Sequence, residues 1–327
     1  LIMMIYIKDL SLFIFILKRF FWLVILLLAL SYVCFAAIHF SKGSVVYAKS
    51  PQGLSDELTA QIESNLNLDK PLNEQYLSWL KGVMSGDFGN SLITGESVNE
   101  IISERLPLTL TLGGLALLVL FFLSLFLALI SIVYKDKFID KALNFISMGF
   151  VATPTFALCL LLILFFSVYL GILPSSGVAD IGFEDIFLNR LTHLILPVSA
   201  LVLVQLGIYL RIFRTILLDS LNQNFIEVAF ARGLSTKRIY FHLVLKHALP
   251  PILTYFAANS VSFLMNTYVV ETVFTYGGVG NLVVESILFK NYPVILAIIV
   301  LSVIAVVVFN LIAELSANIL DTRKAYA

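Results

Sequence analysis

The most polar and basic stretch in the second half of the chain runs from Asn224 to Pro251, between long apolar segments. Asn224 is a residue type that caps the start of a helix, and Gly233, about two turns later, suits the left-handed position that ends one. Ser235 predicts the start of a second short helix, which Pro250 and Pro251 would close. The bases of this stretch predict that it faces the cytosol; they are Arg232, Lys237, Arg238 and Lys246. The stretch therefore predicts a helix-turn-helix between two membrane spans.

A second set of polar side chains lies inside an apolar segment, at a spacing that puts them on one face of a helix. Asn259, Ser262 and Asn266 fall at i, i+3 and i+7. Such side chains are costly in lipid, so this polar stripe is expected to face protein or water. It predicts either a lining of a substrate path, together with Gln205 of the preceding apolar segment, or hydrogen bonds between helices.

No pattern in the sequence predicts catalysis or nucleotide binding. The phosphate-binding signature GxxxxGK[ST] is absent, and no Lys-Ser or Lys-Thr follows Gly277, Gly278 and Gly280, so we interpret these glycines as a tight outer turn. His39 and His193 flank the expected outer face and could touch a metal cargo, but they do not stand at metal-ligand spacing. We therefore expect no catalytic residue, metal site or cofactor in this chain. Energy must come from a partner or from an ion gradient.

The composition is that of a polytopic membrane protein. Of the 327 residues, 60% are hydrophobic and only 13% are charged, which is about half the charged fraction of a soluble domain. The formal net charge of zero gives no reason to expect nucleic acid binding. Cys34 and Cys159 both fall within apolar segments and are expected to be free thiols. The lipid bilayer is therefore the expected environment.

Six apolar segments approach the length of about 20 residues that a bilayer needs, and they predict an all-α integral membrane protein with six transmembrane helices. Their approximate bounds are Phe20–Phe40, Leu108–Tyr134, Asn144–Leu170, Leu194–Ile212, Ile252–Val270 and Tyr292–Leu315. Pro154 is expected to kink the third segment.

These segments divide the chain into three expected regions. Residues 1–40 form an interfacial segment and the first span. Residues 41–105 form a polar extracytoplasmic segment, with helices expected at Leu54–Leu66 and Asn73–Met84. Residues 106–327 form a five-helix core that contains a cytoplasmic loop at 213–250.

Basic residues set the orientation of the spans. The short turn 135–141 carries Lys135, Lys137 and Lys141, whereas the loop 171–193 has Arg190 as its one base. Short cytoplasmic loops are enriched in Lys and Arg, so the turn 135–141 is predicted to lie inside. Both termini are then cytoplasmic.

The stretch 224–251 resembles the EAA loop of binding-protein-dependent ABC importer permeases. Glu227, Ala229 and Gly233 stand at that motif's spacing, with Val228 where alanine is usual. The residues that follow resemble the loop of the peptide/nickel branch, apart from His247 in place of a common asparagine; they are His242, Leu243, Leu245, Lys246, Ala248, Leu249 and Pro251. Further stretches that resemble this family lie within 86–91, 105–109, 165–177 and 271–280.

This resemblance implies an ABC type I importer fold in the cytoplasmic membrane and a transport role without catalysis. In the family the loop is the coupling helix, which docks in a groove of a separate ATPase. The residues implied in that contact here are Phe225, Glu227, Val228, Ala229, Phe230, Arg232 and Gly233. The implied partners are a second, similar permease that completes a heterodimer, two ATP-binding subunits that hold ATP and Mg, and an extracytoplasmic substrate-binding protein.

The resemblance favours di- or oligopeptides as the cargo, moved by alternating access as the partner binds and hydrolyses ATP. A nickel or metal-chelate permease is the alternative within the branch. An ion-coupled secondary transporter is the alternative of another class. It would need ionisable groups buried in its spans, and Glu314 is the one acid within an expected span.

Overall fold

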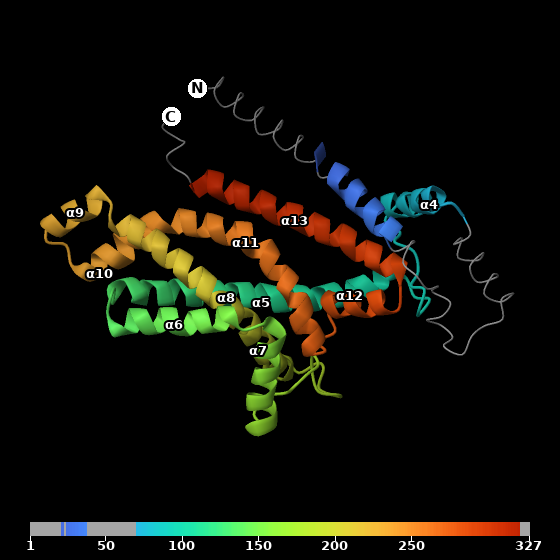
Figure 1. Ribbon diagram of the computed structural model, residues 1–327, viewed down its shortest axis with the longest axis horizontal. Helices are drawn as coiled ribbons and strands as arrows, with labels where there is room; N and C mark the ends of the chain where they lie inside the picture. The colour runs from blue at the N-terminus through green and yellow to red at the C-terminus, as the bar shows by residue number, and fades with distance from the viewer. Residues whose placement is uncertain (1–20, 23, 38–69, 321–327) are drawn as a thin grey trace, which may run out of the picture. The chain divides into compact units, whose positions relative to one another are not determined.

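The computed structural model describes residues 21–22, 24–37 and 70–320, and their side chains except those of 261 and 309–320. Helices dominate the described structure, in which the one isolated β-bridge joins Asn90 and Ser97 (Figure 1). The described residues form two compact units. The first unit contains the residues up to Ser103 together with Val283–Val307, and the second contains Glu104–Leu282 and the residues from Val308 onward.

The first unit packs the helical residues 24–37 against α4 (Leu72–Met84). The hydroxyl oxygens of Tyr76 and Ser31 lie 2.9 Å apart, and both side chains are buried. The ring of Tyr32 meets that of Tyr76 edge-on, with 5.1 Å between centroids. This aromatic contact ties the N-terminal helix to a helix that lies far from it in the sequence, since 45 positions separate Ser31 from Tyr76.

Two helices expected in this unit are present in the described structure. Residues 24–37 are helical and apolar, as the first expected span requires, and α4 matches the helix expected at Asn73–Met84 within one residue. The helix expected at Leu54–Leu66 lies outside the described residues.

The second unit is a bundle of long helices joined by short ones. Its first half runs through α5 (Val98–Val133), α6 (Phe138–Ala152), α7 (Thr155–Leu162), the π-helical segment η1 (Ile163–Tyr169) and α8 (Phe187–Leu221). Its second half runs through α9 (Asn224–Ala231), α10 (Thr236–Arg238), the π-helical η2 (Ile239–Val244), α11 (Leu245–Val273) and the start of α12 (Val279–Leu288). The last helix, α13 (Tyr292–Leu320), belongs to the first unit up to Val307 and to the second from Val308.

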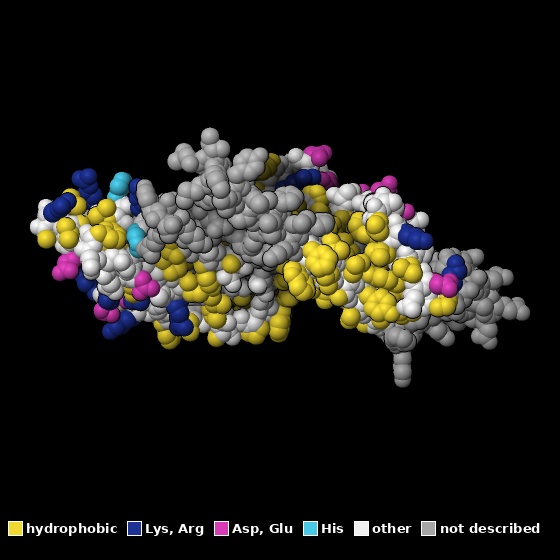
Figure 2. Space-filling view, turned by 90° about the horizontal axis from the view of Figure 1, so that it is seen from above, with side chains coloured by type: hydrophobic (Ala, Val, Ile, Leu, Met, Phe, Trp, Pro, Cys, Tyr) yellow, Lys and Arg dark blue, Asp and Glu magenta, His cyan; other side chains and the backbone are white. Residues whose placement is uncertain are grey.

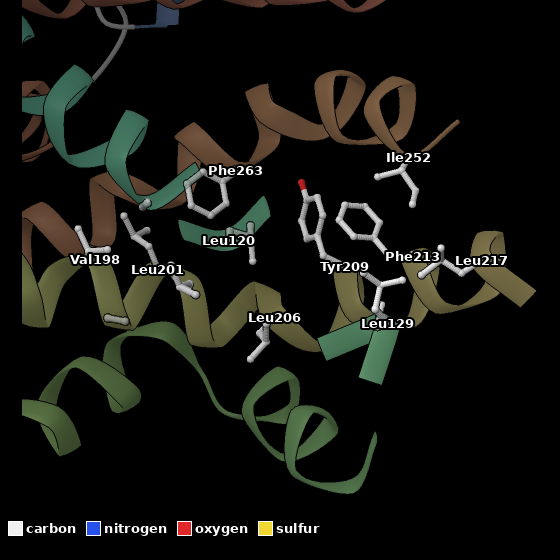
Figure 3. Close-up of a cluster of buried hydrophobic side chains, with 14 of the residues drawn as sticks. Leu120, Leu129, Val198, Leu201, Leu206, Tyr209, Phe213, Leu217, Ile252 and Phe263 are labelled. Atoms are coloured by element: carbon white, nitrogen blue, oxygen red, sulfur yellow. The ribbon is translucent and has the colours of Figure 1, made fainter. Parts of the chain in front are cut away.

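The core of the second unit is built around α8, which packs against α6, α7 and α11. Phe213 of α8 is fully buried, and its ring centroid lies 6.0 Å from that of Phe121 in α5 and 5.9 Å from that of Tyr209. Figure 3 shows Tyr209 and Phe213 pointing from α8 toward the neighbouring helices. Because lipid is as apolar as this core, close packing rather than exclusion of water holds such helices together.

Two glycines allow the helices of this unit to approach closely. A Cβ at Gly113 of α5 would lie 2.6 Å from Leu264 Cδ2 of α11. A Cβ at Gly207 of α8 would overlap the Ser147 carbonyl of α6. Small residues at such crossings are typical of helix packing in membranes.

Two helices, α5 and α8, are each long and apolar enough to cross a membrane. Two bent pairs raise the number to four if each pair is one span: α6 with Thr155–Tyr169, bent by 105°, and Thr236–Ser260 with Ser262–Val273, bent by 49°. Shorter apolar helices occupy Val24–Ala37, Val279–Leu288 and Tyr292–Val308 within the described residues. Of these, α12 was not expected from the sequence, which predicted only a turn at Gly277 to Gly280.

The bend expected at Pro154 is present, but the helix is interrupted there and not only kinked. Thr153 and Pro154 both have extended backbone angles, and they separate α6 from α7. A residue before proline is pushed out of the helical region, and proline has no N–H to continue the ladder. The third expected span is therefore broken into two helices.

The prediction that Pro250 and Pro251 end a helix is wrong. Both lie inside α11, which continues without a break from α10 through η2. Ala248 and Ile252, on either side of the prolines, are fully buried, so tertiary packing holds the helix together where the prolines remove its N–H donors. The stretch after Ser235 is consequently continuous with the start of the fifth expected span, up to the 49° bend between Ser260 and Ser262.

Candidate functional site

The first candidate surface is α9, the short helix that follows α8. Ile226 and Ala229, three residues apart, are buried in the core of the second unit. The side chains of Phe225, Val228 and Phe230 are exposed by 41%, 50% and 46%, and we call these three side chains the α9 surface. A helix fixed by one face and apolar on its open faces is suited to contact another protein.

Gly233 ends α9 as the sequence predicted. Its φ of +71° is in the left-handed region, which glycine adopts without strain. The Gly233 N–H donates to the Phe230 carbonyl at 2.9 Å, and the Leu234 N–H donates to the Ala229 carbonyl at 3.2 Å. These two bonds form a Schellman motif, which satisfies the last carbonyls of the helix and turns the chain toward α10.

The other predicted ends of these short helices differ in detail. Gln223, not Asn224, is the N-cap of α9, and Asn224 is its first helical residue. Ser235 is the N-cap of α10, as expected, but its side chain makes no capping bond. Glu227 and Arg232 are exposed beside the α9 surface, whereas Ala229 supports it from beneath.

His247 of α11 holds α9 in place. Its Nδ1 atom lies 3.0 Å from the Ser220 hydroxyl at the end of α8, and its ring centroid is 5.2 Å from that of Phe225. The imidazole therefore connects α8, α9 and α11.

A buried charge cluster fixes the same end of α8. Arg214 donates from Nη2 to Asp140 Oδ2 at 2.7 Å and from Nε to Oδ1 at 3.0 Å. Asp140 is 4% exposed and also accepts from the Ser131 hydroxyl and from the Asn144 amide. A paired, fully hydrogen-bonded carboxylate of this kind ties α5, α6 and α8 together. Asp140 was not predicted from the sequence, because nothing local distinguishes it from a loop acid.

Basic side chains gather at the end of the second unit that carries α9 and α10, where Figure 2 shows them among apolar side chains. The exposed cations of the 224–251 stretch are Arg232, Lys237, Arg238 and Lys246. Their positions agree with the basic patch that the sequence predicted.

The polar stripe of α11 lies at the border of the face that packs in the core. Ser262 is exposed and Asn259 and Asn266 are half-buried, while the neighbouring Phe263 and Thr267 are buried. The amides of Asn259 and Asn266 donate to carbonyls of their own helix, at 2.8 and 3.2 Å. Gln205 of α8 is half-buried.

At the other end of α11, a group that the sequence analysis did not predict is formed around Glu271. This fully buried carboxylate accepts from the Gly280 N–H at 2.7 Å, at the start of α12. The Thr109 hydroxyl accepts from the Val279 N–H at 2.8 Å, and Arg105 donates to the Gly277 carbonyl at 2.7 Å. We call this arrangement the outer turn.

Within the outer turn, burial raises the pKa of Tyr276 to about 12, and the Glu271 carboxylate contributes to the rise. The Tyr276 hydroxyl therefore stays protonated under ordinary conditions.

The histidines do not form a metal site in the described structure. His193 is buried, with Nδ1 3.0 Å from the Asn189 carbonyl and Nε2 3.6 Å from Asp180. His39 lies outside the described residues, and no group of three or more His, Cys, Asp or Glu side chains gathers within them. Cys34 and Cys159 are free thiols.

The long apolar helices of the described structure are those of an integral membrane protein. The chain belongs to the family described as binding-protein-dependent transport system inner membrane component, whose model matches residues 91–326. The model of that family's N-terminal region matches residues 12–113. Family membership places the chain in the inner membrane as a multi-pass component of a transport system, as the resemblance of the 224–251 stretch predicted.

Individual relatives cover nearly the whole chain. The oligopeptide transport system permease protein AppB of Bacillus subtilis (strain 168) is 34% identical over 302 residues, which are 92% of this chain and 96% of AppB. The metal-staphylopine import system permease protein CntB of Staphylococcus aureus (strain NCTC 8325 / PS 47) is 28% identical over 94% of this chain and 97% of CntB. Among solved structures, the inward-facing MetNI methionine ABC transporter matches in fold with a TM-score of 0.54 at 18% identity, over 67% of this chain and 96% of that chain.

Proposed function

We propose that this chain is a permease subunit of an ATP-driven importer that moves di- or oligopeptides across the cytoplasmic membrane by alternating access. The observation that carries the proposal is the α9 surface. Phe225, Val228 and Phe230 are open on a helix that is otherwise anchored by buried Ile226 and Ala229. Apolar side chains held out on a rigid support are suited to fill a groove of a separate subunit.

Force applied to α9 would reach the membrane helices through its supports. Ser220, Phe225 and His247 link α9 to α8 and α11, and α11 continues directly from α10 and η2. ATP binding in the partner would move α9, and α8 and α11 would tilt as rigid bodies to open the path outward. Hydrolysis would reverse the motion.

The partners follow from the same proposal. A second, similar permease would complete the translocation path as a heterodimer. Two ATP-binding subunits, which hold ATP and Mg, would sit at the cytosolic face, and an extracytoplasmic binding protein would deliver the cargo. This chain would have six spans with both termini in the cytoplasm, so that residues 41–105 lie outside.

The polar stripe of α11 would line the path. Ser262 is exposed and Asn259 and Asn266 are half-buried at the border of the face that packs in the core. Because their amides bond carbonyls of their own helix, they leave oxygen acceptors for a peptide's N–H groups. Gln205 of α8 is the further candidate.

Two relatives bear on the choice between the candidate cargoes. AppB is an oligopeptide permease and has the higher identity, which favours a peptide cargo. CntB, a permease for a metal chelate, keeps a metal-chelate cargo as the second candidate. Testing which ligand raises the thermal unfolding midpoint of the cognate binding protein decides between the two cargoes.

The coupling role is tested with a matched pair of variants, Gly233→Asp and Gly233→Asn. Both side chains tolerate the left-handed backbone better than most residues, and a Cβ here meets no atom within 4 Å. Only aspartate adds a charge that would lose its water in the contact, so we expect ATP-driven uptake in vesicles to fall about tenfold or more for Gly233→Asp. Gly233→Asn should stay within about threefold of wild type. Equal uptake by Gly233→Asp and wild type would contradict the proposal.

A further inference from the structure

An apolar cavity of about 250 Å³ opens between α5 and the α10–η2 segment in the second unit. Its walls are aromatic and aliphatic side chains, and one cation, Lys237, lies among its lining residues. The walls include Phe126, Leu129, Val133, Tyr134, Tyr240 and Phe241. Phe126 is 60% exposed and Phe241 is 54% exposed, so the cavity is open to the surroundings of the bundle.

The cavity runs along the end of α5 for about 12 Å, because Phe126 and Tyr134 are eight residues apart at about 1.5 Å per residue. Its lining is mainly apolar over this length, and Lys237 is the one charged residue in it. A long apolar slot with a single charged lining residue matches a fatty acyl chain whose headgroup lies at the membrane interface.

Cations dominate the rim of this slot. The Lys137 ammonium lies 5.8 Å from the centroid of the Tyr134 ring, which lines the cavity. Lys135 and Arg238 are exposed next to Tyr134 and Lys237 in the sequence. Two acids occur in the adjoining turn, and Asp140 is already paired with Arg214, which leaves Asp136 as the exposed one. The rim therefore favours an anionic headgroup.

We propose that this cavity binds an anionic phospholipid of the cytoplasmic leaflet, with an acyl chain between α5 and η2 and the headgroup phosphate on Lys237. The proposal rests on the orientation proposed above, in which α9 and α10 face the cytosol. Figure 1 shows that the α5–α6 turn and α10 lie at the same end of the second unit.

Such a lipid would act on the coupling segment. The η2 segment packs against α8, α9 and α11. A lipid that fills the space between α5 and η2 would join the α5–α6 hairpin to the rod that carries motion from α9. Coupled transport would then be faster in a bilayer that contains anionic lipid than in a bilayer of neutral lipid.

The test uses the full chain with Phe241→Trp as a fluorescent reporter in the cavity wall and with Trp22 and Trp79 replaced by phenylalanine. The purified protein in bilayer discs is titrated with phosphatidylglycerol or phosphatidylcholine, each brominated on one acyl chain. We expect phosphatidylglycerol to quench the reporter's fluorescence at about fivefold lower mole fraction, since a basic residue near an anionic lipid contributes about that factor. Lys237→Gln should remove the preference, and Lys246→Gln, an exposed base outside the lining, should retain it.

Each other result overturns the proposal. Equal quenching by the two lipids would mean ordinary boundary lipid, and a preference that survives Lys237→Gln would move the headgroup elsewhere. Absence of quenching in a variant whose circular dichroism matches wild type would mean a closed cavity. These readouts need neither ATP nor an ATPase, so they stay informative if the proposed coupling role fails. Reversed orientation of the loop would be found separately, by labelling a cysteine placed at Arg232 in intact cells.

Discussion

The two ends of α11 differ in which groups they bury. At the α9 end, apolar side chains are left open: Phe225, Val228 and Phe230 are exposed by 41–50%. At the other end, in the outer turn, polar groups are buried: Glu271 is 0% exposed and one of its carboxylate oxygens accepts from the Gly280 N–H.

This difference agrees with the proposal that a further subunit binds at the α9 end. The outer turn bonds its polar groups within the chain, apart from Glu271 Oε1, because the Thr109 hydroxyl and the Arg105 guanidinium also bond its backbone. The α9 surface leaves apolar area that nothing in the described structure covers. One end of α11 is therefore closed within the chain, while the other leaves apolar area open, as the proposed partner contact requires.

The largest expected effect is a loss of folding stability when the Arg214–Asp140 ion pair is broken near the α9 end. Arg214→Met leaves the Asp140 carboxylate buried without its cation, which costs about 3 kcal/mol of folding free energy. We expect a clear fall in the thermal unfolding midpoint of the purified protein in detergent. Arg211→Met is the control on the same helix, since Arg211 is exposed and its side chain contacts the Met148 sulfur. Equal midpoints for the two variants would show that the charge cluster does not hold this end.

A smaller effect is expected at the outer turn. A Cβ at Gly278 would lie 2.5 Å from Glu271 Oε2 and 2.5 Å from Thr109 Oγ1. Gly278→Ala therefore forces both groups apart and should cost about 2 kcal/mol of stability. Gly114→Ala in α5, where a Cβ meets no atom within 4 Å, is the matched control and should not lower the unfolding midpoint. An unchanged midpoint for Gly278→Ala would mean that the outer turn is loosely packed.

The smallest effect on stability is expected for the polar stripe, which lies between the two ends of α11. There we expect transport to change without a change in stability. Replacing Asn259 and Asn266 with leucine removes only amide bonds to the same helix, so assembly and the unfolding midpoint should stay near wild type. Uptake should fall severalfold, because the path would lose its polar lining. Thr272→Val, which removes a hydroxyl bonded to its own helix in the same way, is the control. Wild-type uptake by the double variant would remove the stripe from the path.

Local signals in the sequence predicted several features correctly. Gly233 was expected at a helix end, and its φ of +71° and Schellman bonds confirm that position. Pro154 was expected to bend a span, and it separates two helices. Both features depend on the backbone of one or two residues, which residue type controls directly.

One local signal gave a wrong prediction, and another feature had no local signal. Pro250 and Pro251 lie inside α11 because Ala248 and Ile252 are packed in the core around them. Asp140 could not be distinguished from a loop acid, since its partner Arg214 is 74 residues away in the sequence.

By itself the sequence determined the apolar segments, the basic stretch at 224–251 and the family motif within it, because hydropathy, charge and motif spacing are properties of the order of residues. Only the tertiary structure decided which side chains of α9 are open and which are buried. It also decided that His247 and Arg214 anchor this end, and that a cavity lies between α5 and η2. Those features arise where helices distant in the sequence meet, and the packing of one against another is not a property of either segment alone.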